Sequence, residues 1–460
     1  MISFATAQEG FEAGASAVET TPEVFPVRLR SGSSTLVHDP LHARAVAFQN
    51  GEGRVAIALV DAIGLSREEL DEAKIEAAKA TGWQPEEMLI AATHAHTTPG
   101  THGNDPGSVA YREKRFKGMV QSITDAVTSL EPAQVGFGSE DEPSEIRNRR
   151  WFLEEGTMPP NPFGEYDKVQ MNPGLKNLVK PAAPIDPEIC VVDVQTRRGR
   201  PLALFANYAL HYVGNIPSRE VDGREMGMTS ADYFGEFARV MPYRIDRTPS
   251  EDFVAFMTNG TSGDLNNLPF GIERPFRAPF EQCRIVASKA ADAAWRAVRD
   301  IEYDGDPIVA IRQREVALEY RRVTEEQVVR AMKTMEQISE KDEELFPKKA
   351  LQYARNTVKY QTEREPEKVI VQAIRIGDQA ICALPFEVLV EIGLELKAKS
   401  PFPHTFTIEL ANGSYGYLPP PNQHELGGYE TWIGTSRFVP ESSEILVKNL
   451  LEMLAELREM

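Results

Sequence analysis

Residues 87–103, EMLIAATHAHTTPGTHG, join a short apolar run to a polar segment that holds three of the eight histidines of the chain. The run has the length of a β-strand, and residues two apart in a strand point to the same face, so His94 and His96 can present their imidazoles to one point. Zinc accepts neutral imidazole nitrogen, and a catalytic zinc keeps one position open for water. The stretch therefore predicts a buried strand that ends in a metal site, with a pair of hydrogen-bonded loop histidines as the alternative.

Similar strand-like runs occur along the rest of the chain and alternate with helical patterns. The apolar runs lie at residues 54–64, 189–196, 201–211, 253–264, 307–320, 368–385 and 405–417. Apolar residues recur at helical spacing in residues 66–82, 281–300 and 442–460. The GDQ at 377–379 lies between two apolar runs and predicts a hairpin. Together these patterns predict an α/β fold with mixed β-sheets and flanking helices.

Four other strand-like runs resemble the first because each leads into a potential ligand or polar catalytic group. These groups are His211, Asp264, Glu387 and Tyr417. Open α/β sheets bind ligands beyond the carboxyl ends of their strands, so we expect these side chains to converge on one point. For Glu387 alone, capping of the helix that follows it is an equally good explanation.

The overall charge of the chain excludes two classes of partner. The 460 residues include 69 acidic and 50 basic side chains, which give a net charge of -19. Such a charge would repel nucleic acid and anionic membrane surfaces. No run approaches the ~18 apolar residues of a membrane helix, and no signal peptide is evident, so we expect a soluble protein, cytoplasmic or exported if a signal was removed. A small-molecule substrate is the expected partner, and the oligomeric state stays open.

Two known families of HxH metalloenzymes fit the sequence poorly. A metallo-β-lactamase-like site needs the pattern HxHxDH, whereas His96 is followed by TTPG. An amidohydrolase barrel needs two further histidines and an aspartate at strand ends, and outside residues 94–102 only His211 ends a clear apolar run. Neither family is favoured.

Several segments, in the right order, resemble the neutral/alkaline ceramidase family, zinc enzymes that hydrolyse the amide bond of ceramide. The similar segments are ATHAHTTPG (92–100), FANYALH (205–211), NGTSGDLNN (259–267), FEVLVEIGLELK (386–397) and NGSYGYLPPPNQHELGGYE (412–430). The resemblance implies that residues 1–460 form one ceramidase-type catalytic domain, with the charged stretch 321–366 as a helical insertion. We expect no C-terminal immunoglobulin-like domain, because the sequence ends in the helical pattern at 442–460.

The resemblance also assigns roles to single residues. It implies one zinc ion held by His94, His211, Glu387 and Tyr417. It makes His96 and Tyr429 donors to the oxyanion and gives Arg149 a substrate-orienting or charge-stabilising role. Two further positions are expected at the site: Asp264, as a residue that orients a ligand or bonds its own loop, and Asn266, which stands where the family has a serine. His102 is interpreted, with equal weight, as a substrate contact or a loop residue.

The sequence thus predicts a zinc-dependent hydrolase that cleaves an amide (N-acyl) bond with a zinc-activated water. Its substrate would be small and amphiphilic or polar, and a ceramide substrate would place the protein in sphingolipid metabolism. Two alternatives stay open. One is a zinc hydrolase of a polar or carbohydrate-like substrate on the same fold, which the polar and aromatic run at 148–151 favours. The other is a non-catalytic binding protein, which the change at Asn266 favours.

Overall fold

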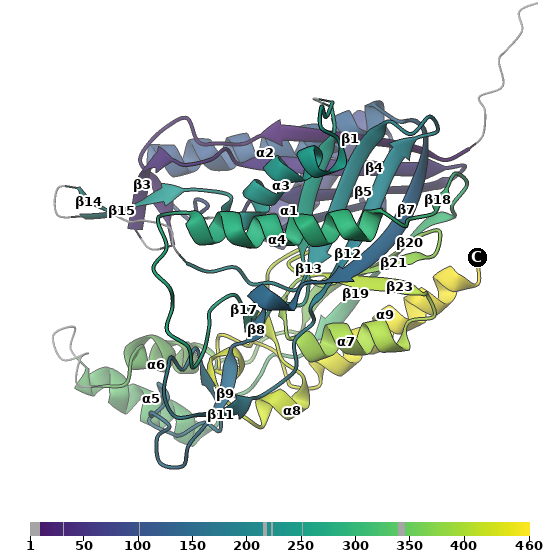
Figure 1. Ribbon diagram of the computed structural model, residues 1–460. Coiled ribbons are helices and arrows are strands. Elements are labelled where there is room, and N and C mark those ends of the chain that lie inside the picture. Colours follow the sequence, from purple (N-terminus) through teal and green to yellow (C-terminus); the bar gives the residue numbers. More distant parts are fainter. Residues whose placement is uncertain are drawn as a thin grey trace, which may run out of the picture.

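Two β-sheets pack face to face, and helices cover the outer face of each, so the fold has four layers in the order helix, sheet, sheet, helix (Figure 1). The computed structural model describes residues 10–30, 32–100, 102–214, 219–221, 224–250, 252–338 and 346–460. Among the helices of these ranges, none is both long enough and apolar enough to cross a bilayer. The expected α/β class with mixed sheets and flanking helices is confirmed.

The larger sheet has nine strands, eight of them in the order β16-β13-β12-β7-β1-β4-β5-β6, and β18 pairs with β7. The pairs β13–β16 and β5–β6 are parallel, which makes the sheet mixed. Its strands are β1 (Glu12–Glu19), β4 (His42–Asn50), β5 (Gly53–Val60), β6 (Met88–Ala92), β7 (Glu131–Asp141), β12 (Glu188–Thr196), β13 (Pro201–Tyr208), β16 (Val254–Asn259) and β18 (Tyr303–Asp304).

Alternate residues of these strands face different layers, because successive side chains of a strand point to opposite faces. In β4, Ala43, Ala45 and Ala47 lie in the cluster under the helices, whereas Val46 and Phe48 face the second sheet. The alanines allow helices to approach the sheet closely, and the larger side chains fill the space between the sheets. The covering helices are α1 (Arg67–Thr81), α2 (Pro106–Thr128), α3 (Asp232–Ile245) and α4 (Glu281–Val298).

The smaller sheet has the order β19-β20-β21-β23 and packs its inner face on the larger one. Ile374 and Ile376 contribute to the shared core, and Val369 and Val371 belong to the outer cluster with the last helices. These strands are β19 (Val309–Leu318), β20 (Glu367–Ile376), β21 (Gln379–Ala383) and β23 (His404–Ile408), and the outer helices are α7 (Val390–Lys399) and α9 (Ser442–Arg458).

Short elements fill the region between the sheets and the insertion. Two-stranded ladders join β8 (Arg147–Asn148) to β17 (Leu265–Asn266) and β22 (Glu387–Val388) to β24 (Tyr417–Leu418). A three-stranded sheet contains β9 (Arg150–Leu153), β10 (Gln170–Met171) and β11 (Leu178–Pro181), and a four-stranded one contains β2 (Val27–Leu29), β3 (Gly32–Val37), β14 (Arg219–Val221) and β15 (Arg224–Thr229). The remaining helices are α5 (Glu325–Gln337), α6 (Ala350–Lys359), α8 (Pro421–His424) and 3₁₀ turns at Pro85–Glu87, Pro143–Glu145 and Tyr429–Thr431.

The apolar runs found in the sequence all contain strands, and most of the strands are shorter than the runs. Residues 87–96 give β6, which ends at Ala92, and residues 201–211 give β13, which ends at Tyr208. The hairpin at 368–385 is confirmed, with Gly377 at a positive φ of 59° in its turn. The helix at 66–82 begins as expected, because the Ser66 side chain accepts a hydrogen bond from the Glu69 N–H.

A buried carboxyl group in β12 predicts a pH-dependent stability. Burial raises the pKa of Asp193 to about 6, although Tyr303 donates a hydrogen bond of 2.5 Å to its Oδ2. The unfolded chain releases this proton near pH 4, about two units earlier, so the wild-type protein loses up to ~3 kcal/mol of stability as the pH rises from about 4 to 6.

An asparagine at this position still accepts the bond from Tyr303 and does not ionise. We therefore expect the difference in melting temperature between Asp193→Asn and the wild type to grow in favour of the variant from pH 4 to pH 7. Circular dichroism measures both melting temperatures. Asp252→Asn, at an exposed position, is the control. A difference in melting temperature that stays constant with pH would contradict the argument.

Candidate metal centre

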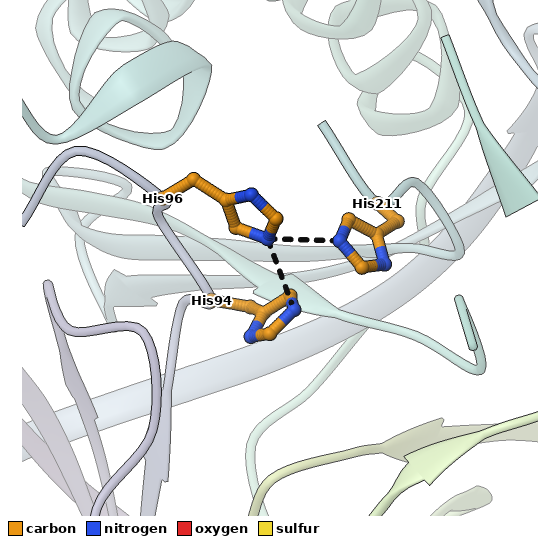
Figure 2. A group of neighbouring side chains, drawn as sticks. All are labelled: His94, His96 and His211. Carbon is orange, nitrogen blue, oxygen red and sulfur yellow. Dashed lines mark hydrogen bonds between the residues drawn. The ribbon is translucent and has the colours of Figure 1, made fainter. Parts of the chain in front are cut away.

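Three imidazoles from two distant parts of the chain meet in a buried cluster (Figure 2). Nε2 of His96 lies 3.2 Å from Nε2 of His94 and 2.9 Å from Nε2 of His211. The ligand atoms of the three residues all lie within 4.8 Å of one another. Such a cluster could hold a metal ion, and it unites the segments after β6 and β13, as the sequence predicts.

The backbone after β6 differs from the expected strand. His94 has a positive φ of 67°, so the two histidines do not owe their common direction to strand alternation. Instead, the His94 N–H donates to the Ala62 carbonyl, and its Nδ1 donates to the Ile63 carbonyl at 2.6 Å. The loop after β5 thereby fixes both the backbone and the ring of His94, with Nε2 directed at the cluster.

The hydrogen-bond partners of the rings indicate that the cluster could hold a cation. Because Nδ1 of His94 donates to Ile63, a neutral His94 has a lone pair at Nε2. Arg149 donates to Nδ1 of His211 at 3.2 Å, so His211 carries its proton at Nε2 and donates it to His96. The Nε2 lone pairs of His94 and His96 then face each other at 3.2 Å. Either a proton on His94 or a metal ion removes this conflict.

Glu387 and Tyr417 join the cluster through a second pair of segments. They are direct partners in the parallel ladder of β22 and β24, and the Glu387 N–H donates to the Gly416 carbonyl. Oε2 of Glu387 lies 3.4 Å from Nε2 of His94 and 4.0 Å from Nδ1 of His211. The four residues expected to bind zinc are therefore neighbours, although their role as ligands stays a prediction.

Arg149 connects this group to a second buried carboxylate. Its guanidinium donates to the Tyr417 hydroxyl at 2.9 Å and to Oε1 of Glu430 at 2.8 Å, in addition to His211. Glu430 also accepts a bond of 2.7 Å from Arg150. Two buried arginines thus share one buried glutamate, an arrangement that leaves one positive charge in excess next to the histidines.

Electrostatics at the cluster follow from burial and from these pairs. Burial lowers the pKa of His94, but the Glu387 carboxylate outweighs this effect and leaves the pKa raised. Burial and the charge of His94 hold the pKa values of His96 and His211 well below the usual range. Burial raises the pKa of Glu387, yet His94 and Tyr417 lower it more. The chain thus favours neutral His96 and His211 and an ionised Glu387, whereas His94 favours a bound proton, which a metal ion at this position would replace.

Tyr429 lies at the edge of the cluster. Its ring packs edge-on against Tyr417, with 5.5 Å between ring centroids, and against Trp432 at 5.8 Å. Burial, followed by the charge of Glu387, raises the pKa of the phenol, so the hydroxyl keeps its proton and is able to donate it.

Asp264 and Asn266, two further candidate site residues, form hydrogen bonds with residues other than the three imidazoles. Asp264 bonds the Val390 N–H and the Asn148 amide, and burial raises its pKa to about 6. Its carbonyl accepts from the Arg149 N–H, so it positions that residue. Asn266 donates to Asn172 and accepts from the Leu268 N–H, which occupies both ends of its amide. His102 is exposed.

Sequence analysis missed three buried carboxylates that support the cluster. Asp232 accepts from the His96 N–H at 2.8 Å and from Thr97, and Glu409 accepts from the Val388 N–H at 2.7 Å. Glu430 holds Arg149 and directly follows Tyr429, the one signal in the sequence that could have drawn attention to it. Asp232 and Glu409 have no such signal, because only the tertiary fold brings them to the site.

Comparison with solved structures identifies the fold. A crystal structure of neutral ceramidase from Pseudomonas aeruginosa superposes with a TM-score of 0.70 and 16% sequence identity, over 98% of this chain and 75% of that chain. A ceramidase complexed with C2 gives a TM-score of 0.69 at 16% identity, over 98% of this chain and 76% of the other. No family model and no curated protein sequence matches the chain. The chain has the fold of neutral ceramidase, as the sequence resemblance implies.

Proposed function

We propose that the protein is a zinc-dependent hydrolase that cleaves the amide bond of an N-acyl compound. The observation that carries the proposal is the meeting of His94, His211, Glu387 and Tyr417 beside the buried guanidinium of Arg149. Two imidazoles and a carboxylate are the three protein ligands that a catalytic zinc takes. The phenol of Tyr417 is included as a fourth ligand on the family resemblance alone. The similarity in fold to neutral ceramidases supports an amide as the bond that is broken.

Hydrolysis of an amide joins the oxygen of water to the acyl carbon, breaks the C–N bond and transfers a proton to the amine nitrogen. A bound zinc ion would supply Lewis acidity and lower the pKa of water. The chain itself supplies donors for the negative charge that develops on the carbonyl oxygen. With a metal ion on His94 and His211, the proton of His211 would have to leave Nε2, so Nε2 of His96 would no longer have to accept it and could donate a proton, as could the Tyr429 hydroxyl.

Arg149 has a positioning and charge-stabilising role in this proposal. Burial raises the pKa of the Tyr417 phenol well above its usual range, and the charge of Arg149 acts against this effect. Arg149 also favours the neutral imidazole of His211, and Glu430 holds the guanidinium in place. Asn266 cannot act as a nucleophile, and its amide is already bonded. Water is therefore the only nucleophile that the proposal needs.

Removal of the metal tests the proposal directly. Dialysis against a chelator is expected to abolish hydrolysis of N-acyl substrates, because no side chain at the site substitutes for the Lewis acid. Zinc added at one equivalent should restore the activity, measured together with metal content by mass spectrometry. If the chain binds zinc and cleaves no N-acyl compound, it is a binding protein and the proposal is wrong.

A further inference from the structure

Two cations lie near the cluster and are not among the residues expected to bind a metal. Lys349, in the insertion, places its Nζ 5.3 Å from the centroid of the Tyr429 ring. Arg30 follows β2 and acts by its charge on His96, His211, Tyr429 and Lys349. Both side chains are exposed. Lys349 and Arg30 therefore place two positive charges near Tyr429 in a chain whose net charge is -19.

Contacts of neighbouring residues anchor the backbone next to both cations. Lys349 immediately precedes α6, where Tyr353 packs edge-on against Trp432 at 5.2 Å, and Trp432 in turn packs against Tyr429. Near Arg30, the Arg28 carbonyl accepts from the N–H of Gly100, at the end of the segment that follows His96. The insertion and the β2 segment are thus fastened to the loops that form the cluster.

The two cations repel each other and lack acidic partners in the part of the chain that the structure describes. Burial and the charge of Arg30 together lower the pKa of Lys349. The two carboxylates of the cluster that the structure describes next to Tyr429 are already engaged, because Glu430 binds two arginines and Glu387 faces His94. Two like charges held together without a counterion attract an anion.

We propose that Lys349 and Arg30 bind an anionic group of the substrate, and that the substrate is an N-acyl amino acid with a free carboxylate. The inference rests on the proposed function, because that function places the amide at Tyr429 and His96. The carboxylate of an N-acyl amino acid is separated from its amide nitrogen by a single carbon. It would reach Lys349 when the amide carbonyl accepts from Tyr429. A neutral substrate would offer neither cation a counterion.

A pair of substrates that differ in charge alone tests the inference. N-dodecanoylglycine and N-dodecanoylethanolamine have the same acyl chain and the same amide bond. The glycine compound ends in a carboxylate, whereas the ethanolamine compound ends in a hydroxymethyl group. For the zinc-loaded full chain we expect kcat/KM to be at least about tenfold higher for the glycine compound. Lys349→Gln and Arg30→Gln should each lower this ratio by about tenfold. Lys348→Gln, a neighbouring exposed lysine, is the matched control and should keep the wild-type ratio.

Binding of the same compounds, measured by calorimetry, separates this inference from the proposed function. Tighter binding of N-dodecanoylglycine that depends on Lys349, without cleavage of either amide, would support the anion site and refute the hydrolase. Cleavage of both amides with no preference for the carboxylate, or with a preference that survives both substitutions, would overturn the anion site and leave the hydrolase intact.

Discussion

Replacing His94 by alanine is expected to remove both the metal and the activity. The ring directs Nε2 at Glu387 at 3.4 Å, and the Ile63 carbonyl holds the proton of the neutral ring on Nδ1, which leaves Nε2 as the nitrogen that can bind a metal. Residues that only orient a metal ligand change affinity by about 10- to 100-fold, so loss of the ligand itself should exceed about 100-fold. At sub-stoichiometric zinc, turnover of an N-acyl substrate should fall below detection. Metal content by mass spectrometry and hydrolysis of N-dodecanoylglycine measure the two effects.

His102→Ala is the matched control, because this histidine belongs to the same segment and is exposed. It should retain one zinc per chain. Circular dichroism of both variants checks that the four layers are intact. Zinc bound at full stoichiometry and wild-type affinity by His94→Ala would show that the cluster is not the metal centre.

Much of the fold could be predicted because buried strands carry apolar residues on both faces. Strands such as β5 and β16 lie between a helical layer and the second sheet, so their sequences are nearly continuous apolar runs. By contrast, the sequence patterns did not predict α2, although Asp105 caps this helix and Pro106 is its first residue. Many charged residues and the central Gly118 obscure its periodicity. Gly118 is required there, because a Cβ would lie 2.4 Å from the Thr20 side chain.

The candidate site shows a different limit of sequence analysis. Polar residues after apolar runs were sufficient to find His94, His211 and Glu387, because the ends of buried strands and of their connecting loops lie at a common edge. The reason given for pairing His94 with His96 was wrong, since β6 ends at Ala92 and a left-handed residue directs the ring. Lys349 was assigned to a solvated insertion. Its place beside Tyr429 depends on aromatic packing between segments about 80 residues apart, which no local pattern encodes.

Tyr429→Phe is expected to lower kcat by about 100- to 1,000-fold with little change in KM. The substitution removes only the hydroxyl, so the ring contacts with Tyr417 and Trp432 remain. A donor that bonds the oxyanion more strongly than the ground-state carbonyl acts on kcat, and its loss costs about 3 kcal/mol of barrier. Steady-state kinetics on an N-acyl substrate separate the two constants, and zinc content should equal that of wild type. Tyr415→Phe removes a hydroxyl from the same segment and should leave kcat unchanged, because that ring packs on Phe386 in the outer core. A rise in KM at constant kcat would instead assign Tyr429 to substrate binding, and the stabilisation of the oxyanion would then depend on His96 and the metal alone.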